Sequence, residues 1–281
     1  MIKQELIKSS LDFIENSEEN YIKQENAISE TTVGMKIFED PIFAFGDAGD
    51  EYFTRLKDPA IIGSHFKLPK EWLPQAKTVI SYFLPFTETV KKGNSQERIW
   101  PSQEWLHGRY EGQMLLNKLS VYLQTKLINA GYLSISPSLD QSFWSKRKLN
   151  EGLVNIDNDD KNLLSFTSNW SERHVAFVCG LGTFGLSKGL ITSKGMAGRF
   201  GSIVTELQLS PNGREYQGIY EYCSECGACI KQCPVNAISY EKGKDHHICC
   251  EFVDEIKKKY KPRYGCGKCQ VSVPCESCIP I

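Results

Sequence analysis

The chain carries eleven cysteines, and ten of them lie beyond residue 215. The first run reads CSECGACIKQCP, in which three cysteines stand at two-residue gaps, a fourth follows three residues later, and a proline comes next. Three sulfurs at that spacing bind one [4Fe–4S] cluster, and the fourth characteristically serves a second cluster nearby. Six further cysteines follow downstream. The sequence therefore predicts two [4Fe–4S] clusters and, with them, electron transfer.

Two other uses of the cysteines have to be weighed. Cys266 and Cys269, with Cys275 and Cys278, form two CxxC pairs that could make a zinc ribbon. A disulfide framework is a weaker alternative, because the cysteines are confined to one end of a long chain without a signal peptide. The triple-spaced first run with its Cys-Pro ending suits neither, so iron–sulfur clusters are favoured.

The break in cysteine content predicts two domains, residues 1–215 and residues 216–281. In the first, residues 77–86 and 174–180 are typical of buried strands, residues 132–140 alternate like a strand, and residues 111–131 have helical spacing. Strands that alternate with helices predict an α+β fold. Residues 145–169 are polar and poorly periodic, which indicates an excursion over the surface.

Charge and hydropathy exclude several classes of function. A net charge of −1 gives no electrostatic basis for a standing nucleic-acid partner. No apolar run approaches the roughly 20 residues needed to cross a bilayer, so no membrane association is expected. Residues 1–16 have the pattern of an amphipathic helix and not of a targeting segment. We expect a protein of a reducing cytoplasm, as in an anaerobe.

A glycine-rich motif follows residues 174–178. In CGLGTFG, Gly180, Gly182 and Gly185 satisfy GxGxxG, and Glu206 lies about 20 residues beyond, as in a dinucleotide-binding fingerprint. The next stretch is too rich in glycine for the helix that such a site requires. We therefore favour close backbone approach to a large flat ligand over nicotinamide binding.

With these features together, the chain resembles epoxyqueuosine reductases and, more distantly, reductive dehalogenases. The resemblance is carried by HGRYEGQMLLNKL (residues 107–119), by ERHVAFVCGLGTFGLSKGLITSKGMAGRFGSIVTEL (residues 172–207), and by HHICCEF and RYGCGKCQ in the cysteine-rich segment. It implies a nitroreductase-like, cobalamin-binding core followed by a ferredoxin-like domain with two [4Fe–4S] clusters. The cofactor-binding residues implied are Arg109, Gly180, Leu181, Gly182, Thr183, Phe184, Gly185 and Gly198.

The resemblance also implies a partition of the cysteines. One cluster would take Cys223, Cys226, Cys229 and Cys275, and the other would take Cys233, Cys249, Cys266 and Cys269. The chain departs from the family here, because Val273 stands where a cysteine is expected. Either Cys275 or Cys278 must therefore be the fourth ligand of the first cluster. We favour Cys275, because it is expected to reach the cluster more easily. Cys179, Cys250 and Cys278 are left over as ordinary thiols.

The resemblance implies a cobalamin-dependent reductase that receives electrons from a ferredoxin or flavodoxin. The implied proton donors are Asp140, whose pKa would have to be raised by burial, and Tyr110. The chain lacks the family's helical-repeat domain after Ile281, has Thr183 in place of a tryptophan, and is about 25 residues longer after Asp140. These departures predict a small organic substrate and not tRNA.

Two rival functions remain open. The first is an electron-transfer module that delivers electrons to a partner's corrinoid or flavin. The second is a reductase of the same fold that binds FMN. The basic run at residues 257–263 is most simply a solvated face, with a docking patch for an acidic electron donor as the alternative.

Overall fold

The computed structural model describes residues 3–145 and 167–281. Its centre is a four-stranded antiparallel sheet in the order β1–β2–β6–β3. The strands are β1 (Ile42–Asp47), β2 (Thr78–Pro85), β6 (Gly198–Thr205) and β3 (Ser134–Ile135). β2 and β6 pair along their whole length, from Thr78 opposite Thr205 to Pro85 opposite Gly198. The sheet thus joins segments more than a hundred residues apart in the sequence.

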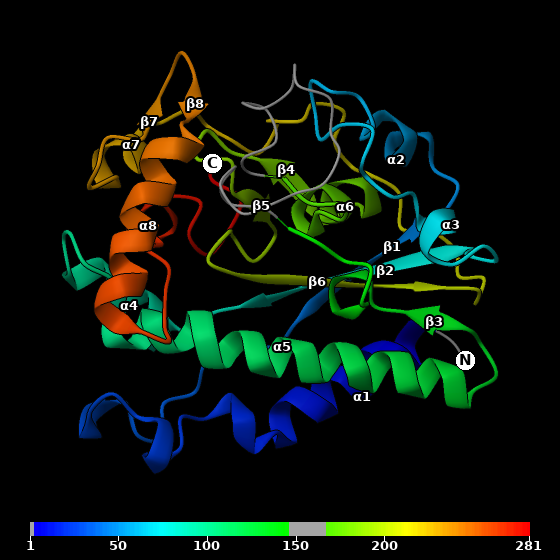
Figure 1. Ribbon diagram of the computed structural model, residues 1–281, viewed down its shortest axis with the longest axis horizontal. Coiled ribbons are helices and arrows are strands. Elements are labelled where there is room, and N and C mark those ends of the chain that lie inside the picture. Colours follow the sequence, from blue (N-terminus) through cyan, green and yellow to red (C-terminus); the bar gives the residue numbers. More distant parts are fainter. Residues whose placement is uncertain (1–2, 146–166) are drawn as a thin grey trace.

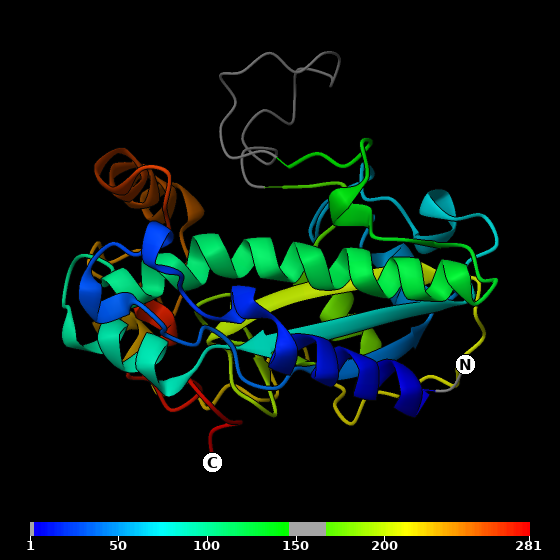
Figure 2. The same cartoon turned by 90° about the horizontal axis from the view of Figure 1, so that it is seen from below.

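Helices cover both faces of this sheet (Figure 1). The long helix α5 (Gln103–Asn129) lies across one face, with α1 (Lys3–Asn16) beside it, as Figure 2 also shows. The short helix α6 (Glu172–Cys179) packs on the opposite face. Two hydrophobic cores result, one between the sheet and α5 and one between the sheet and α6.

Strand β2 shows how the sequence produces this layered arrangement. All eight of its residues are buried. Successive side chains of a strand point to opposite faces, so Ile80 and Tyr82 enter the core beneath α5 while Val79 and Phe83 enter the core beneath α6. A continuous apolar strand is what a sheet covered on both faces requires.

The cysteine-rich segment lies at one end of the sheet, next to α4 (Figure 1, left). Backbone contacts tie the segment to the rest of the chain: the Met196 N–H donates to the Cys275 carbonyl at 3.0 Å. The Asn94 side-chain amide donates to the Cys266 carbonyl at 3.1 Å. The remaining helices and strands are α2 (Glu51–Arg55), α3 (Pro69–Trp72), α4 (Glu88–Gln96), β4 (Gly182–Phe184), β5 (Leu190–Thr192), α7 (Ala228–Gln232), β7 (Ile238–Ser239), β8 (Gly243–Lys244) and α8 (His246–Tyr260).

Several predicted elements are confirmed. The N-terminal helix, the strand at residues 77–86 and the long helix are present as α1, β2 and α5. Helix α5 begins eight residues earlier than its apolar spacing predicts, because Ser102 caps it: its hydroxyl accepts the Trp105 N–H at 3.2 Å.

One predicted strand is wrong, and a second is confirmed only in part. Residues 174–179 form the C-terminal part of α6 and not a strand, and the left-handed Gly180, with φ of 98°, follows as the cap that ends that helix. A short apolar run does not by itself distinguish a buried helix from a buried strand. In residues 132–140, only Ser134–Ile135 pair with β6. Pro137 then begins a 3₁₀ turn that ends before Asp140.

Two further predictions are not tested by the structure. The excursion at residues 145–169 falls largely outside the described residues. The division into domains at residue 215 stays a prediction. In the described part of the chain, no helix has both the length and the apolar character to cross a membrane.

Candidate iron–sulfur and cofactor site

Four cysteines line a first cavity in the C-terminal segment. They are Cys223, Cys226, Cys229 and Cys275. Gly227 takes a left-handed conformation, with φ of 69°, and begins α7 between the second and third of these cysteines. The glycine-rich stretch also reaches this cavity, because a Cβ on Gly185 would lie 3.8 Å from the Cys223 Sγ.

Four other cysteines line a second, larger cavity of about 140 Å³. They are Cys233, Cys249, Cys266 and Cys269. Two of these sulfurs already accept hydrogen bonds: the Ala237 N–H lies 3.1 Å from the Cys233 Sγ, and the Lys244 ammonium lies 3.7 Å from the Cys269 Sγ. The structure therefore gathers the eight cysteines in two groups of four, the same groups that the resemblance implies.

The chemistry of this donor set fits [4Fe–4S] clusters, each of which takes four thiolates. Within residues 3–145 and 167–281, no three His, Cys, Asp or Glu side chains are arranged to hold a single metal ion. Burial raises the pKa of the Cys229 thiol to about 11 and those of Cys266 and Cys275 to about 12. Iron binding must therefore displace protons from these thiols.

The three remaining cysteines line neither cavity. Cys250 is buried in α8, and Cys278 is exposed, with its Sγ 3.6 Å from the Pro274 carbonyl. Cys179 is buried between α6 and the sheet, where its thiol donates to the Val79 carbonyl at 3.6 Å. Burial raises the pKa of Cys179, so this thiol stays protonated.

The glycine motif approaches the protein itself at close range. A Cβ on Gly182 would lie 1.9 Å from the Ile191 carbonyl oxygen, and one on Gly198 would lie 2.2 Å from the Leu84 carbonyl oxygen. The motif follows a helix, whereas a dinucleotide-binding fingerprint follows a strand and opens a helix. Close packing against the protein's own backbone therefore requires glycine at these two positions.

The residues between those glycines are also held by the protein. Thr183 is buried, and its hydroxyl accepts the Tyr222 N–H at 2.8 Å. Leu181 is buried in the core beneath α6. The Phe184 ring lies 4.9 Å from the His174 ring.

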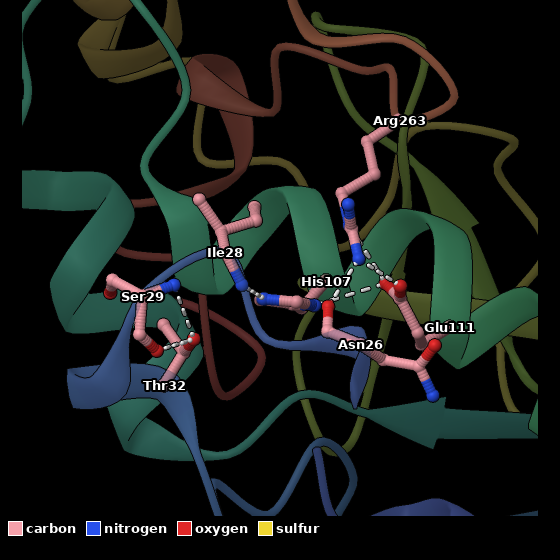
Figure 3. A network of polar contacts seen from close by, with 7 residues as sticks. All are labelled: Asn26, Ile28, Ser29, Thr32, His107, Glu111 and Arg263. Atoms are coloured by element: carbon pink, nitrogen blue, oxygen red, sulfur yellow. Dashed lines mark hydrogen bonds and ion pairs between the residues drawn. The ribbon is translucent and has the colours of Figure 1, made fainter. Parts of the chain in front are cut away.

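The HGRYE motif at the start of α5 forms a polar network with the cysteine-rich segment (Figure 3). His107 is fully buried; its Nε2 accepts the Ile28 N–H at 3.1 Å, and its Nδ1 donates to Glu111 at 3.1 Å. Arg263 binds the same carboxylate, with Nε 3.2 Å from Oε2, and also the Asn26 carbonyl at 2.6 Å. Burial acts to raise the pKa of Glu111, but the hydrogen bonds from His107 and Arg263 outweigh it and lower that pKa.

Arg109 and Tyr110 follow His107 in the same motif on α5. Arg109 lines the cavity, and its guanidinium lies 5.2 Å from the centre of the Tyr264 ring. The Arg263 guanidinium lies 5.9 Å from the centre of the Tyr110 ring. Arg109 thus lies near the cysteines of the second cavity, whereas Tyr110 lines neither cysteine cavity.

Asp140 lacks the environment that a proton donor near neutral pH requires. Its carboxylate accepts hydrogen bonds from the Ser142 N–H at 2.8 Å and from the Ser142 hydroxyl at 2.7 Å. These two bonds lower its pKa, and the residue is half-buried at the end of a 3₁₀ turn. Asp140 therefore does not have the raised pKa that the role of proton donor would require.

Glu172 has the environment predicted for Asp140. Both of its carboxylate oxygens are buried, and neither has a hydrogen-bond partner among the described residues, although Ser138, Ser202 and Trp170 lie near them. Burial raises the pKa of this carboxyl group to about 7. The sequence signal was weak, since Glu172 merely precedes an apolar run in the stretch that carries the resemblance.

The next residue, Arg173, lines the second cavity. Its side chain keeps an exposed surface, but the protein around it removes enough water for burial to lower its pKa. On the neighbouring strand β6, Arg199 has a buried Nε without a hydrogen-bond partner among the described residues. These cationic side chains gather where the sheet, α6 and the cysteine-rich segment meet.

Comparison with known proteins agrees with this picture. A model described as a 4Fe-4S binding domain matches residues 216–239. The chain is 33% identical over 123 residues to the epoxyqueuosine reductase of Francisella cf. novicida (strain Fx1), a match that covers 39% of this chain and 33% of that protein. It is 31% identical over 116 residues to a tetrachloroethene reductive dehalogenase of Desulfitobacterium hafniense, covering 38% of this chain and 21% of that protein.

Solved structures share the fold over most of the chain. The epoxyqueuosine reductase of Streptococcus thermophilus superposes with a TM-score of 0.51 at 17% identity, covering 100% of this chain and 68% of that one. A reductive dehalogenase whose structure is linked to B12-dependent dehalogenation has a TM-score of 0.51 at 13% identity, covering 85% of this chain and 30% of that one. The predicted resemblance is confirmed. The sequence matches span a third or less of each curated relative, so the relatives' activities do not transfer directly to this chain.

Proposed function

We propose that the chain is an iron–sulfur and cobalamin-dependent reductase, with two [4Fe–4S] clusters that pass low-potential electrons to a corrinoid and on to a small organic substrate. The observation that carries the proposal is the pair of cavities, each lined by four cysteines. Under this proposal Cys223, Cys226, Cys229 and Cys275 hold one cluster, and Cys233, Cys249, Cys266 and Cys269 hold the other. The reductases among the relatives support the same class of chemistry.

Cobalamin is proposed on the likeness to a reductive dehalogenase linked to B12. When bound, a corrinoid supplies a cobalt centre that can carry the reductive step. Arg109, Gly185 and Gly198, with the neighbouring residues 180–184, are the proposed contacts. The buried Nε of Arg199 fits this proposal, because it has no hydrogen-bond partner among the described residues. The buried carboxylate of Glu172 fits it too, because Ser138, Ser202 and Trp170 lie near it without hydrogen bonds of good geometry.

Asp140, Tyr110 and Glu172 are the candidate proton donors. Glu172 is the best suited to hold a proton near neutral pH, since burial raises its pKa to about 7. Asp140 would need to lose its two hydrogen bonds to Ser142 before it could act. Comparing proton uptake during single turnover in Glu172→Gln, Asp140→Asn and Tyr110→Phe would separate the three.

The substrate, the donor and the location are proposed on less direct grounds. A net charge of −1 favours a small organic substrate over tRNA. A small ferredoxin or flavodoxin is the proposed electron donor, and the basic residues Lys257, Lys258 and Lys261 near the end of α8 offer an acidic carrier a docking surface. A cytoplasmic location is proposed because the free thiols need a reducing compartment.

The test is anaerobic purification followed by iron and sulfide analysis, with matched cysteine variants. We expect about eight irons per chain for the wild type and about four for Cys275→Ser and Cys249→Ser. Cys278→Ser and Cys250→Ser are the controls, because each removes a neighbouring cysteine that lines neither cavity. They should keep about eight irons.

A spectroscopic titration with hydroxocobalamin then tests the corrinoid. A spectrum that shifts on binding supports the reductase. Eight irons with no response to the corrinoid would exclude cobalamin and leave the electron-transfer module or an FMN enzyme, which a flavin titration would distinguish. Iron content near zero in the wild type would overturn the whole proposal.

A further inference from the structure

The two cysteine cavities differ sharply in the charges around them. Four cationic side chains line the second cavity: Arg109, Arg173, Lys244 and Lys268. Among the described residues that line the first cavity, the charged side chain is Glu225, which is negative. The cysteines of the second cavity are therefore surrounded by positive charge, whereas those of the first cavity face a carboxylate.

Lys244 makes the closest of these contacts. Its Nζ lies 3.7 Å from the Cys269 Sγ, which is hydrogen-bonding distance to sulfur. The short hairpin of β7 and β8 fixes this position, since Lys244 pairs with Ile238 at the end of β8. Asp245 follows at once and caps α8 through the His247 N–H at 2.8 Å, so the backbone on both sides of Lys244 is held.

Arg173 faces the same cysteines from α6. It lies on the wall of the second cavity, and its nearest charged neighbours include Cys249 and Cys269. The charge of Lys268 has less effect on the cysteines, because its ammonium is already bound to Asn94. It donates to the Asn94 carbonyl at 2.8 Å and to the Asn94 Oδ1 at 3.1 Å. The charge in closest contact with the thiols is therefore that of Lys244, with Arg173 behind it.

We propose that Lys244, supported by Arg173, raises the reduction potential of the cluster held by Cys233, Cys249, Cys266 and Cys269 above that of the other cluster. This inference rests on the proposed function, since it requires both clusters. Reduction adds one electron to the cluster, and with it one negative charge. A nearby cation and an N–H···S hydrogen bond favour the reduced state, and both are known determinants of cluster potential.

The ordering of potentials gives the molecule a direction for electrons. The first cluster would have an exposed ligand, Cys226, whereas all four cysteines of the second cavity are partly buried. One electron would leave the first cluster, which is oxidised, and enter the second, which is reduced. Lys244 thus makes the transfer toward the second cluster favourable.

The test is a potentiometric titration of the anaerobic full-length protein, followed by electron paramagnetic resonance with dithionite as reductant. Two one-electron couples of unequal potential are expected in the wild type. In Lys244→Met, the ratio of reduced to oxidised second cluster at a fixed potential should fall about tenfold, which equals a shift of 59 mV for a one-electron couple. The more negative couple should not move, and Lys244→Arg, which keeps the charge, should restore the higher potential.

The matched control is Lys242→Met, because Lys242 lies in the same hairpin but is exposed and outside the cavity. If Lys244→Met loses iron, Arg173→Met provides the same test, with a smaller shift in the same direction. Two clusters with potentials unmoved by either substitution would overturn this inference alone. Fewer than two clusters in the wild type would overturn the proposed function as well.

Discussion

Glu172 shows how burial sets the chemistry of a single residue. Its carboxyl group lies beside Trp170, whose indole N–H donates to the Ser202 hydroxyl at 2.9 Å. No cation pairs with the carboxylate among the described residues. Desolvation therefore dominates, and the protonated form is favoured up to a pH of about 7.

A dependence of stability on pH follows at this residue. The pKa of Glu172 rises from 4.5 to about 7 on folding, so the unfolded chain loses this proton first as pH rises. The free energy of unfolding should therefore fall between pH 4.5 and 7, by about 3 kcal/mol, and the loss should be complete above pH 7. Glu172→Gln removes this loss.

The measurement is the unfolding of Glu172→Gln and of the wild type, compared at each pH from 5 to 8. We expect the variant to gain stability relative to the wild type as pH rises through this range. Asp140→Asn is the control, since hydrogen bonds lower the pKa of Asp140 and its charge is present throughout. A difference between Glu172→Gln and the wild type that does not change with pH would contradict the prediction.

At the scale of elements, the turn from α6 into the hairpin of β4 and β5 decides what the glycines do. Gly180 ends α6 in the left-handed conformation, and Gly182 pairs with Thr192 in the hairpin. The hairpin then leads to Gly185 on the first cysteine cavity. The spacing of the glycines reflects the packing of one backbone against another.

Substitution of Gly182 tests this packing. A Cβ there would lie 1.9 Å from the Ile191 carbonyl oxygen, and backbone atoms cannot move aside cheaply. We expect Gly182→Ala to cost about 3 kcal/mol, which lowers the Tm of a chain of this size by roughly 5–10 °C. Thermal unfolding without added corrinoid measures this effect.

Gly218→Ala provides the comparison, because a Cβ at Gly218 meets its nearest atom at an ordinary 3.7 Å. Its Tm should stay close to that of the wild type. If Gly182→Ala unfolds like the wild type and loses only corrinoid binding, the glycine would serve a ligand and not the packing of the hairpin.

At the scale of the whole molecule, Arg263 joins three distant parts of the chain (Figure 3). Arg263 lies three residues before Cys266 in the sequence. It binds Glu111 in α5 and the Asn26 carbonyl near the N-terminus. The side chains of Arg263 and Glu111 are only 15% and 12% exposed. The ion pair therefore fixes the loop that brings Cys266 and Cys269 to the second cavity.

Arg263→Ala should lower the free energy of unfolding by about 1.5–3 kcal/mol. The reason is that the largely buried Glu111 carboxylate loses its hydrogen bonds to Arg263 and keeps only the one from His107. It should also speed the release of iron to a chelator, with about half of the iron lost first. Arg55→Ala is the control, since the Arg55–Glu51 pair has side chains 57% and 74% exposed and contributes little. Equal rates of iron release from the two variants would show that the Arg263 contact does not hold the second cavity.

The sequence alone determined the features that depend on local spacing. The run CSECGACIKQCP specifies cluster chemistry because its ligand gaps are built into consecutive residues. β2 could be predicted from its continuous apolar run, and α5 from its helical spacing. The likeness to epoxyqueuosine reductases and reductive dehalogenases could also be seen from its motifs.

Only the tertiary structure decided the features that depend on which segments meet. The apolar run of α6 could have been a strand until its position against β2 and β6 was known. Asp140 and Glu172 have the same functional group, but the Asp140 carboxylate accepts two hydrogen bonds from Ser142, whereas both carboxylate oxygens of Glu172 are buried. The cations around the second cavity come from α5, α6, β8 and the loop between Cys266 and Cys269. A residue's solvation and charged neighbours arise from contacts across the chain, and those contacts set its pKa and the potential of whatever it faces.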